Sequence, residues 1–214
     1  SSFAGKCHCD RGRLFFEGED LIRMKRRQLD KIRGARISYV PQGSGNGLNP
    51  LLTVGLQVAE PMIEHQKVKK REAIAEAVRL MKRFHIGDEE EVAGQYPFTY
   101  SGGMKQRAMI AMGIIAGADM ILADEPTKGL DEERIEMVVE AFHSLKDQAV
   151  LCVTHDLNFA REISDSISVM YASNQVEYAP AEELLEHPLH PYTQDMIAAM
   201  PENGLHFPKL CHGS

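Results

Sequence analysis

Three short apolar runs in the second half of the chain limit its possible folds more than any other feature. They are Met120–Ala123, Val150–Val153 and Ile167–Tyr171, and each has the length and the residue types of a β-strand. The stretch from Glu132 to Leu145, between the first two runs, has apolar residues at helical spacing. A strand, a helix and a strand at this spacing predict crossover connections and a parallel sheet.

A further strand is predicted upstream, at Ile37–Val40, because a proline stops this β-rich run. Residues Gly43 to Pro50 have the glycine and asparagine content of a loop. Helical patterns then extend from Lys69 to Phe84 and from Met104 to Gly117. We therefore expect an α/β core with a parallel sheet, interrupted by a helical insertion at about residues 46–117.

Composition places the chain among globular proteins. With 214 residues and 43% hydrophobic content, it can bury one sizeable core, alone or with a smaller subdomain. The formal net charge of −7 disfavours nucleic acid as a partner, and the basic residues of Arg23–Arg36 are expected on a solvated helix face. No apolar run reaches the roughly 20 residues that span a bilayer, and the amino end carries no secretory signal pattern. We therefore expect a cytoplasmic polypeptide that needs a separate partner for any role at a membrane.

The four cysteines do not form the dense pattern of a disulfide framework. Cys152 lies in an apolar run and is expected to be buried. Cys7-His8-Cys9 and Cys211-His212 contain residue types that bind Zn²⁺, but their spacing fits no common zinc site. We therefore do not expect a resident metal ion at either end of the chain.

Two short polar motifs flank this part of the chain: one precedes the second helical pattern, and the other follows the strand after it. Asp124 and Glu125 end the strand, where one carboxylate can hold hydrated Mg²⁺ and the other can accept a proton. Ser101, Gly102 and Gly103 open the helix, where free backbone N–H groups suit an anion. Taken singly, the first motif is also typical of a solvated strand end and the second of an ordinary helix cap.

The sequences around these motifs resemble those of one family. The string LADEPTKGLD, from Leu122 to Asp131, is similar to the Walker B motif and D-loop of ATP-binding cassette ATPases. The string SGGMKQR, from Ser101 to Arg107, is similar to their signature motif. The resemblance implies a P-loop NTPase-like core that uses ATP and Mg²⁺. It also implies that the carboxylates of Asp124 and Glu125 act on the nucleotide bound by their own subunit. It also implies that the signature motif contacts the ATP of a second subunit.

The resemblance assigns roles to further residues. It makes Asp124 the Mg²⁺ ligand and Glu125 the general base, and it places Asp131, in the D-loop, among the residues that bind the nucleotide. His155, after the strand at Val150–Val153, matches the switch histidine that contacts the γ-phosphate. Gln42 matches the Q-loop glutamine, which senses Mg²⁺ and the attacking water and leads into the helical subdomain. A histidine or glutamine at a strand end is more often structural, so these roles depend on the resemblance.

Finer features are similar to one branch, the ATP-binding subunits of oligopeptide, dipeptide and nickel importers. They are the segment from Leu48 to Gly55 and the tail from His187 to Thr193, which contains an HPYT element. For such a subunit the resemblance implies transmembrane permease subunits and a second ATPase subunit, identical or related, as partners. An extracellular substrate-binding protein would act indirectly, and the subunit would lie on the inner face of the cell membrane.

One expected part has no counterpart in the sequence. Such ATPases need a loop of the form G-x-x-x-x-G-K-[ST] to surround the phosphates. Gly5-Lys6-Cys7 is the nearest match, but it lacks the Ser or Thr, and too few residues follow it before the strand near Arg13. The segment from Phe15 to Leu21 resembles a family motif that normally follows this loop. We therefore expect that the chain begins inside the domain and is inactive as it stands, although a degenerate domain is the alternative.

The expected organisation has four parts. Residues 1–45 are the amino-terminal part of the ATPase core with the Q-loop, and residues 46–117 are a helical subdomain. Residues 118–180 are the remaining core, and residues 181–214 are a tail. Two other functions stay open beside import. One is a non-catalytic module that keeps the fold, and the other is an ATP-binding cassette ATPase that acts in DNA repair or translation.

Overall fold

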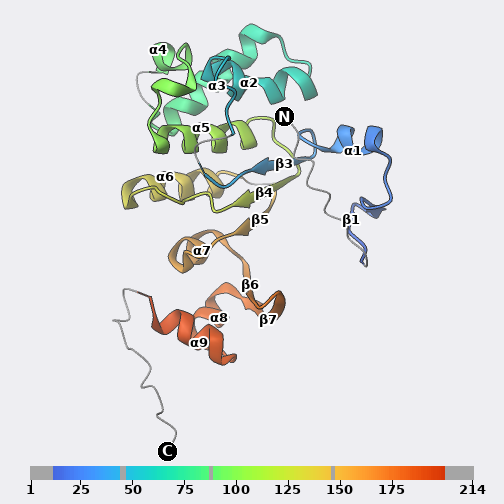
Figure 1. Ribbon diagram of the computed structural model, residues 1–214, viewed down its shortest axis with the longest axis vertical. Helices are drawn as coiled ribbons and strands as arrows, with labels where there is room; N and C mark the ends of the chain where they lie inside the picture. Colours follow the sequence, from blue (N-terminus) through green and yellow to red (C-terminus); the bar gives the residue numbers. More distant parts are fainter. Residues whose placement is uncertain (1–11, 44–46, 87–88, 146–147, 201–214) are drawn as a thin grey trace, which may run out of the picture.

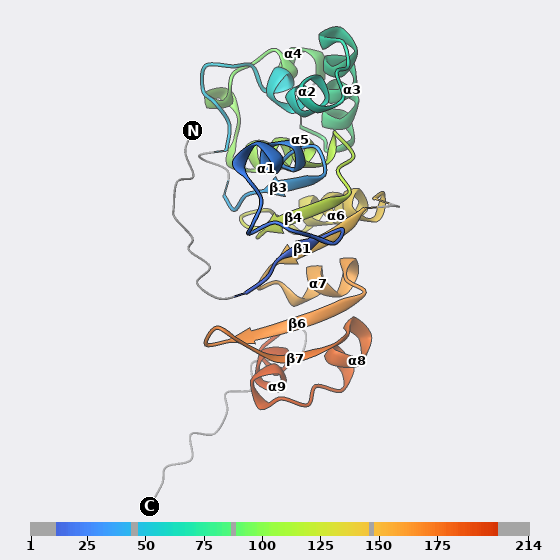
Figure 2. The same ribbon diagram turned by 90° about the vertical axis from the view of Figure 1, so that its right-hand side faces the viewer.

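The computed structural model describes residues 12–43, 47–86, 89–145 and 148–200. Its elements follow one another along the long axis of the molecule, as Figure 1 shows. A group of helices lies at one end, a parallel sheet lies in the middle, and a hairpin with two short helices lies at the other end. The turned view in Figure 2 shows the same order.

The central sheet consists of three parallel strands in the order β3-β4-β5. These are β3 (Ile37–Val40), β4 (Met120–Asp124) and β5 (Ala149–Val153). The middle strand, β4, is paired along its whole length and buries Ile121 and Ala123. Because all three strands are parallel, their carboxyl ends meet at one edge of the sheet, which is where such sheets present ligand sites.

The chain between β3 and β4 is helical, as expected. It contains α2 (Val54–His65), α3 (Lys70–Arg83), α4 (Glu89–Ala93), the 3₁₀ turn η1 (Pro97–Thr99) and α5 (Gly102–Ile114). Their apolar faces form the larger part of the main core, including Val58, Ala77, Met81 and Met109. The helical pattern of the sequence therefore identified α3 and α5, while α2 was not expected as a separate helix.

Helix α5 joins this group to the sheet, and most of its residues are buried. Gly113 lets the helix approach β3, because a Cβ at this position would lie 2.5 Å from a methyl carbon of Val40. The Ser38 hydroxyl of β3 donates a hydrogen bond to the carbonyl of Gly113. A larger residue at position 113 would separate the helix from the strand.

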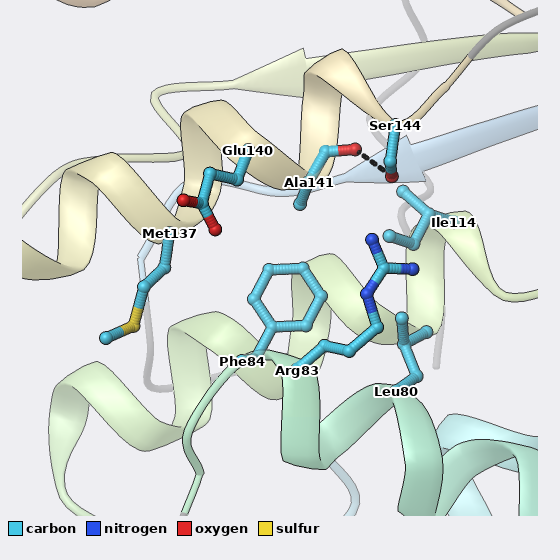
Figure 3. A pocket seen from close by; sticks show the side chains of 8 residues that line it. All are labelled: Leu80, Arg83, Phe84, Ile114, Met137, Glu140, Ala141 and Ser144. Carbon is cyan, nitrogen blue, oxygen red and sulfur yellow. Dashed lines mark hydrogen bonds between the residues drawn. The ribbon is translucent and has the colours of Figure 1, made fainter.

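The other crossovers are α6 (Glu132–His143) and α7 (Leu157–Ile163). They pack together through an edge-to-face pair of Phe142 and Phe159, whose ring centres are 6.0 Å apart. Between α6 and the helical group lies a cavity of about 30 Å³, which Figure 3 shows with Phe84 on one side and Ala141 on the other. This cavity has room for about one water molecule and is too small for a nucleotide.

A small amino-terminal unit precedes the sheet. It comprises β1 (Phe15–Phe16), β2 (Glu19–Asp20) and α1 (Arg26–Ile32). Arg36 connects this unit to the sheet, because its guanidinium contacts the carboxylates of Glu17 and Asp119 at 2.5 and 2.7 Å. The same guanidinium lies 5.1 Å from the ring centre of Phe16, within cation–π range. Residues 21–24, which precede this helix, form turns and a bend.

The tail is more regular than expected. It contains β6 (Ser166–Tyr171), β7 (Asn174–Pro180), α8 (Ala181–Glu186) and α9 (Pro191–Ala198). The sequence indicated a strand at Ile167–Tyr171, which corresponds to β6, but β7 and α9 were not expected. The two strands form an antiparallel hairpin in a sheet of its own, and Val169, Leu184 and Leu185 form a second small core beneath it.

Glu177 of β7 connects the hairpin to the segment before α9. Its two carboxylate oxygens accept the backbone N–H groups of Leu189 and His190 at 2.7 and 3.1 Å. The Nδ1 atom of His190 accepts the N–H of Tyr192 and caps the helix, which Pro191 begins. The His-Pro-Tyr element therefore forms a helix start that is held to the hairpin by the Glu177 carboxylate and by the contact of the Tyr192 ring with Tyr171.

We expect this connection to weaken in acid. The Thr193 hydroxyl and the N–H groups of Leu189 and His190 hold the pKa of Glu177 below its ordinary value. The stabilisation is therefore complete above the ordinary carboxyl pKa and is lost as pH falls through the lowered one. Hydrogen exchange of the Leu189 and His190 amides should show protection that falls in acid and is several-fold weaker in Glu177→Gln. Glu183→Gln, at an exposed position of α8, should change neither. Equal protection in Glu177→Gln would contradict this account.

The structure also bears on the metal-binding residue types, the cysteines and the apolar segments of the sequence. Within the described residues, no group of three or more His, Cys, Asp or Glu side chains is arranged to hold a metal ion. Cys7-His8-Cys9, Cys211-His212 and Gly5-Lys6-Cys7 lie outside the described residues. Cys152 is partly rather than fully buried, and burial, with Glu125 and Asp124 nearby, raises the pKa of its thiol to about 12. Among the described helices, none has the length and apolar character to cross a bilayer.

Candidate functional site

The two carboxylates at the end of β4 form the centre of the site. Asp124 is the last residue of the strand and is paired with Val153 of β5. Glu125 follows with φ at +48°, a left-handed conformation that non-glycine residues seldom adopt. Its backbone N–H donates to the carbonyl of Val153 at 2.8 Å, so the pairing with β5 continues through the turn. Backbone strain of this kind is typical of functional positions.

His155 contacts Glu125 directly. Its Nδ1 atom lies 2.7 Å from Oε2 of Glu125, although the two residues come from different strands. The turn that carries His155 is fixed by a hydrogen bond from the N–H of Asp156 to the Thr154 hydroxyl. Asp156 then caps α7 by accepting the N–H groups of residues 158 and 159. The Glu125 side chain is 14% exposed and the His155 side chain 75%, so the histidine covers the carboxylate from the solvent side.

Tyr39 of β3 is a further residue of the site, which no motif in the sequence marks. Its hydroxyl donates a hydrogen bond to Oδ2 of Asp124 at 3.3 Å. Partial burial and the Asp124 carboxylate raise the pKa of Tyr39, so the hydroxyl keeps its proton. The signal in the sequence was a tyrosine inside a strand that also leads to Gln42, but only the pairing of β3 with β4 shows which carboxylate it meets.

Gln42 lies at the same edge of the sheet. It is exposed and follows the end of β3 by two residues, and Val40 of this strand is opposite Ala123. The parallel register therefore places Gln42 on the side of the sheet where Asp124 and Glu125 emerge. The four residues Gln42, Asp124, Glu125 and His155 come from three neighbouring strand ends.

Ser101, Gly102 and Gly103 form the start of α5. The Ser101 hydroxyl accepts the N–H of Met104 at 3.3 Å, which is ordinary N-capping. A Cβ on Gly103 would lie 3.5 Å from a methyl carbon of Leu130, the residue before Asp131. The start of α5 therefore lies beside the turn between β4 and α6, where Asp131 caps α6 by accepting the N–H of Arg134.

Two buried polar residues of α5 extend this connection. The Gln106 side chain donates to the carbonyl of Pro126 at 3.1 Å, directly after the carboxylate pair. The Arg107 guanidinium donates to the carbonyl of His85 at 3.4 Å, and its Nε and one terminal nitrogen are buried without a hydrogen bond to the described residues. Burial and nearby Arg134 lower the pKa of Arg107, while Asp131 opposes this change. Both residues belong to the string SGGMKQR, but no role had been predicted for them.

The donors present fit magnesium as it is usually bound with nucleotides. Asp124 offers a carboxylate at the sheet edge, and Mg²⁺ is commonly held by one or two carboxylates, water and phosphate oxygens. A cage of protein ligands is neither required nor found among the described residues. The residues of this site therefore fit Mg²⁺ that arrives with a nucleotide.

Comparison with known proteins identifies the class to which this arrangement belongs. The ABC transporter family model matches residues 1–128, more than half of the chain. The chain therefore belongs to the ATP-binding cassette family. A second model, for the C-terminal region of oligopeptide and dipeptide transporters, matches residues 176–210, which include most of β7 and the whole of α8 and α9.

Individual relatives include ATP-binding proteins of dipeptide transport. The chain is 36% identical over 202 residues to the dipeptide transport ATP-binding protein DppD of Bacillus subtilis, covering 93% of this chain and 60% of the relative. It is also 36% identical to the probable D,D-dipeptide transport ATP-binding protein DdpD of Escherichia coli, covering 91% and 60%. The chain thus spans about three fifths of the length of these relatives.

The fold agrees with solved cassettes. The structure matches the dimeric ATP-binding cassette MJ0796, in a post-hydrolysis state with ADP and phosphate, at a TM-score of 0.73 and 27% identity. This match covers 80% of the present chain and 74% of the other. The expected α/β fold of the ATP-binding cassette family is therefore confirmed.

Proposed function

We propose that this chain is the larger part of an ATP-binding subunit that energises the import of small peptides. The observation that carries the proposal is the contact of His155 with Glu125 beside Asp124, in a member of the ATP-binding cassette family. The match of the tail to oligopeptide and dipeptide transporters supports peptides as the cargo. Nickel, which the sequence resemblance also allowed, has no comparable support among the relatives named above.

The carboxylates would act on the nucleotide of their own subunit. Asp124 would hold Mg²⁺, which neutralises phosphate charge when it is bound. Glu125 would accept a proton from the attacking water, and its contact with His155 would fix the direction of the carboxylate. His155 and Gln42 would contact the region of the γ-phosphate, with Gln42 also near Mg²⁺.

The start of α5 would act on the nucleotide of a second subunit. Ser101, Gly102 and Gly103 offer free backbone N–H groups at the positive end of a 13-residue helix. Asp131 lies in the adjoining turn and would contact the nucleotide beside these residues. The dimeric form of the cassette MJ0796 supports such a pair, identical or related.

The helical part of the chain would face the membrane. We propose the organisation expected from the sequence, with residues 46–117 as the subdomain that contacts the permease and residues 181–214 as the transporter-specific tail. Leu51, Tyr96 and Phe98 are 81%, 42% and 73% exposed, and the rings of Tyr96 and Phe98 are stacked at 5.8 Å. The N–H of Val54 donates to the carbonyl of Gln95, so the two segments are adjacent. Such an exposed apolar patch suits contact with an apolar helix of the permease at the inner face of the membrane. The substrate-binding protein would act only from the outer side.

This proposal is tested by recovery of the permease. The tagged chain should co-purify with transmembrane subunits from the membranes of its own cells. Phe98→Glu should lower that recovery by about tenfold or more, because a charge would replace an exposed aromatic anchor. Leu189→Glu, at a position in the tail that is 83% exposed, should leave the recovery unchanged. If no membrane protein is recovered with the unmodified chain, the importer function is wrong.

A further inference from the structure

A buried glutamine of α2 is bonded to the exposed turn that precedes this helix. Gln57 is 3% exposed and lies on the helix between Val54 and Val58, which are fully buried. A buried amide side chain needs hydrogen-bond partners, because leaving its donors and acceptor unpaired is costly. Among the described residues, the three partners of the Gln57 side chain are all backbone groups of Asn49 and Leu52.

The sequence of the turn, Asn49-Pro50-Leu51-Leu52, suits a tight reversal of the chain. Asparagine is favoured at the first position of such a turn and proline at the second. The N–H of Leu52 donates to the carbonyl of Asn49 at 3.3 Å, and the N–H of Leu51 donates to the Asn49 side-chain oxygen at 3.0 Å. These bonds shape the turn, but they join only neighbouring residues and do not fix it to the core.

Gln57 supplies the connection to the core. Its Oε1 atom accepts the N–H of Asn49 at 2.6 Å, and its Nε2 atom donates to the carbonyls of Asn49 and Leu52 at 3.0 and 2.9 Å. One carboxamide therefore holds both ends of the turn, because it carries an acceptor and two donors. An apolar side chain of similar length could fill the same space but could make none of these bonds.

The residue at the tip of this fixed turn is apolar and open to solvent. Leu51 is 81% exposed, although Leu48 before the turn and Val54 after it are buried. Its side chain therefore gains little from burial within the chain, and its packing does not explain why the turn is held so firmly. An apolar group fixed in solvent favours binding, because the cost of ordering the loop is met during folding rather than during association.

We propose that Gln57 is a positioning residue, which holds Leu51 in place as an apolar anchor for a helix of the permease. Leu51 belongs to the same exposed patch as Tyr96 and Phe98, and this continuity indicates one partner for all three side chains. The nature of the partner rests on the proposed function, but the fixed turn does not.

Hydrogen exchange tests the turn on the chain alone. Gln57→Met keeps the length of the side chain and removes its three bonds. The Asn49 amide should then exchange about tenfold faster or more, the equivalent of one lost hydrogen bond, while the later amides of α2 keep their protection. Gln66→Met is the matched control, because the Gln66 side chain also donates to a backbone carbonyl, that of Ala116 at 2.7 Å, but at the far end of α2. It should leave the Asn49 amide unchanged.

Recovery of transmembrane subunits from the membranes of the chain's own cells tests the anchor. Gln57→Met and Leu51→Ala should each lower this recovery by about fivefold or more, and Gln66→Met should not. The double variant should be no worse than Leu51→Ala, because the glutamine acts through the leucine. A merely structural role predicts effects that multiply instead. If Gln57→Met does not fold, Asn49→Ala replaces it in this cycle, since it removes the bond to the Leu51 N–H from an exposed position.

Three results would overturn the proposal. They are equal exchange of the Asn49 amide in the unmodified chain and in Gln57→Met, unchanged recovery in Gln57→Met, and effects that multiply in the double variant. If the unmodified chain recovers no membrane protein while the exchange of Asn49 changes as expected, the result counts against the proposed function, and the fixed turn stands.

Discussion

In a chimera that places the amino-terminal part of a longer relative before this chain, Glu125→Gln is expected to lower kcat for ATP hydrolysis by about 10²–10⁴-fold. Glutamine keeps the size of the side chain but cannot accept the proton of the attacking water. Because the same change removes no phosphate contact, the affinity for ATP should stay within a few-fold of the unmodified value. Steady-state phosphate release and equilibrium nucleotide binding measure the two effects separately.

The controls separate chemistry from general damage. Glu133→Gln removes the same charge from the exposed first turn of α6 and should leave kcat unchanged. The 214-residue chain without the added segment should bind ATP weakly and hydrolyse none. Turnover by that chain which disappears in Glu125→Gln would contradict its proposed inactivity. A chimera with full activity after Glu125→Gln would remove the residue from the mechanism.

The sequence predicted the strands of the parallel sheet well because their signal is local. Runs such as Met120–Ala123 are apolar throughout, and the carboxylates that follow them mark the strand end. Parallel order then places Gln42, Asp124 and His155 at one edge without any knowledge of side-chain packing. This much of the candidate site required only strand direction.

The parts that could not be predicted depend on pairings between distant segments. In the sequence, Tyr39 looks like an ordinary strand residue. Only the register of β3 with β4 shows that its hydroxyl reaches Asp124. The strand β7 has few apolar residues, and it is ordered by pairing with β6 and by the contacts of Glu177. Cys152 was expected to be buried because its neighbours are apolar, but β5 has a free edge. Local composition cannot indicate whether a neighbouring strand is present.

The largest effect on stability is expected for Phe84→Ala, at the contact between the helical part and the sheet. Phe84 is the C-cap that follows α3, is 1% exposed and faces α6 across the small cavity of Figure 3. Truncation removes the ring from the core and enlarges this cavity, at a cost of about 3–5 kcal/mol. That is a large part of the roughly 5–15 kcal/mol by which domains are stable. Denaturant unfolding followed by circular dichroism measures the change.

Phe98→Ala is the matched control because it removes the same ring from a 73% exposed position. We expect it to change the free energy of unfolding by less than about 0.5 kcal/mol, as surface substitutions usually do. The difference between the two variants therefore isolates the packing of α3 against α6 from the chemistry of the side chain. Equal effects would mean that the Phe84 ring does not join the helical part to the core. A large effect of Phe84→Ala alone, in a single cooperative transition, means that the helical part and the sheet unfold as one unit, which the proposed transmission of movement between them requires.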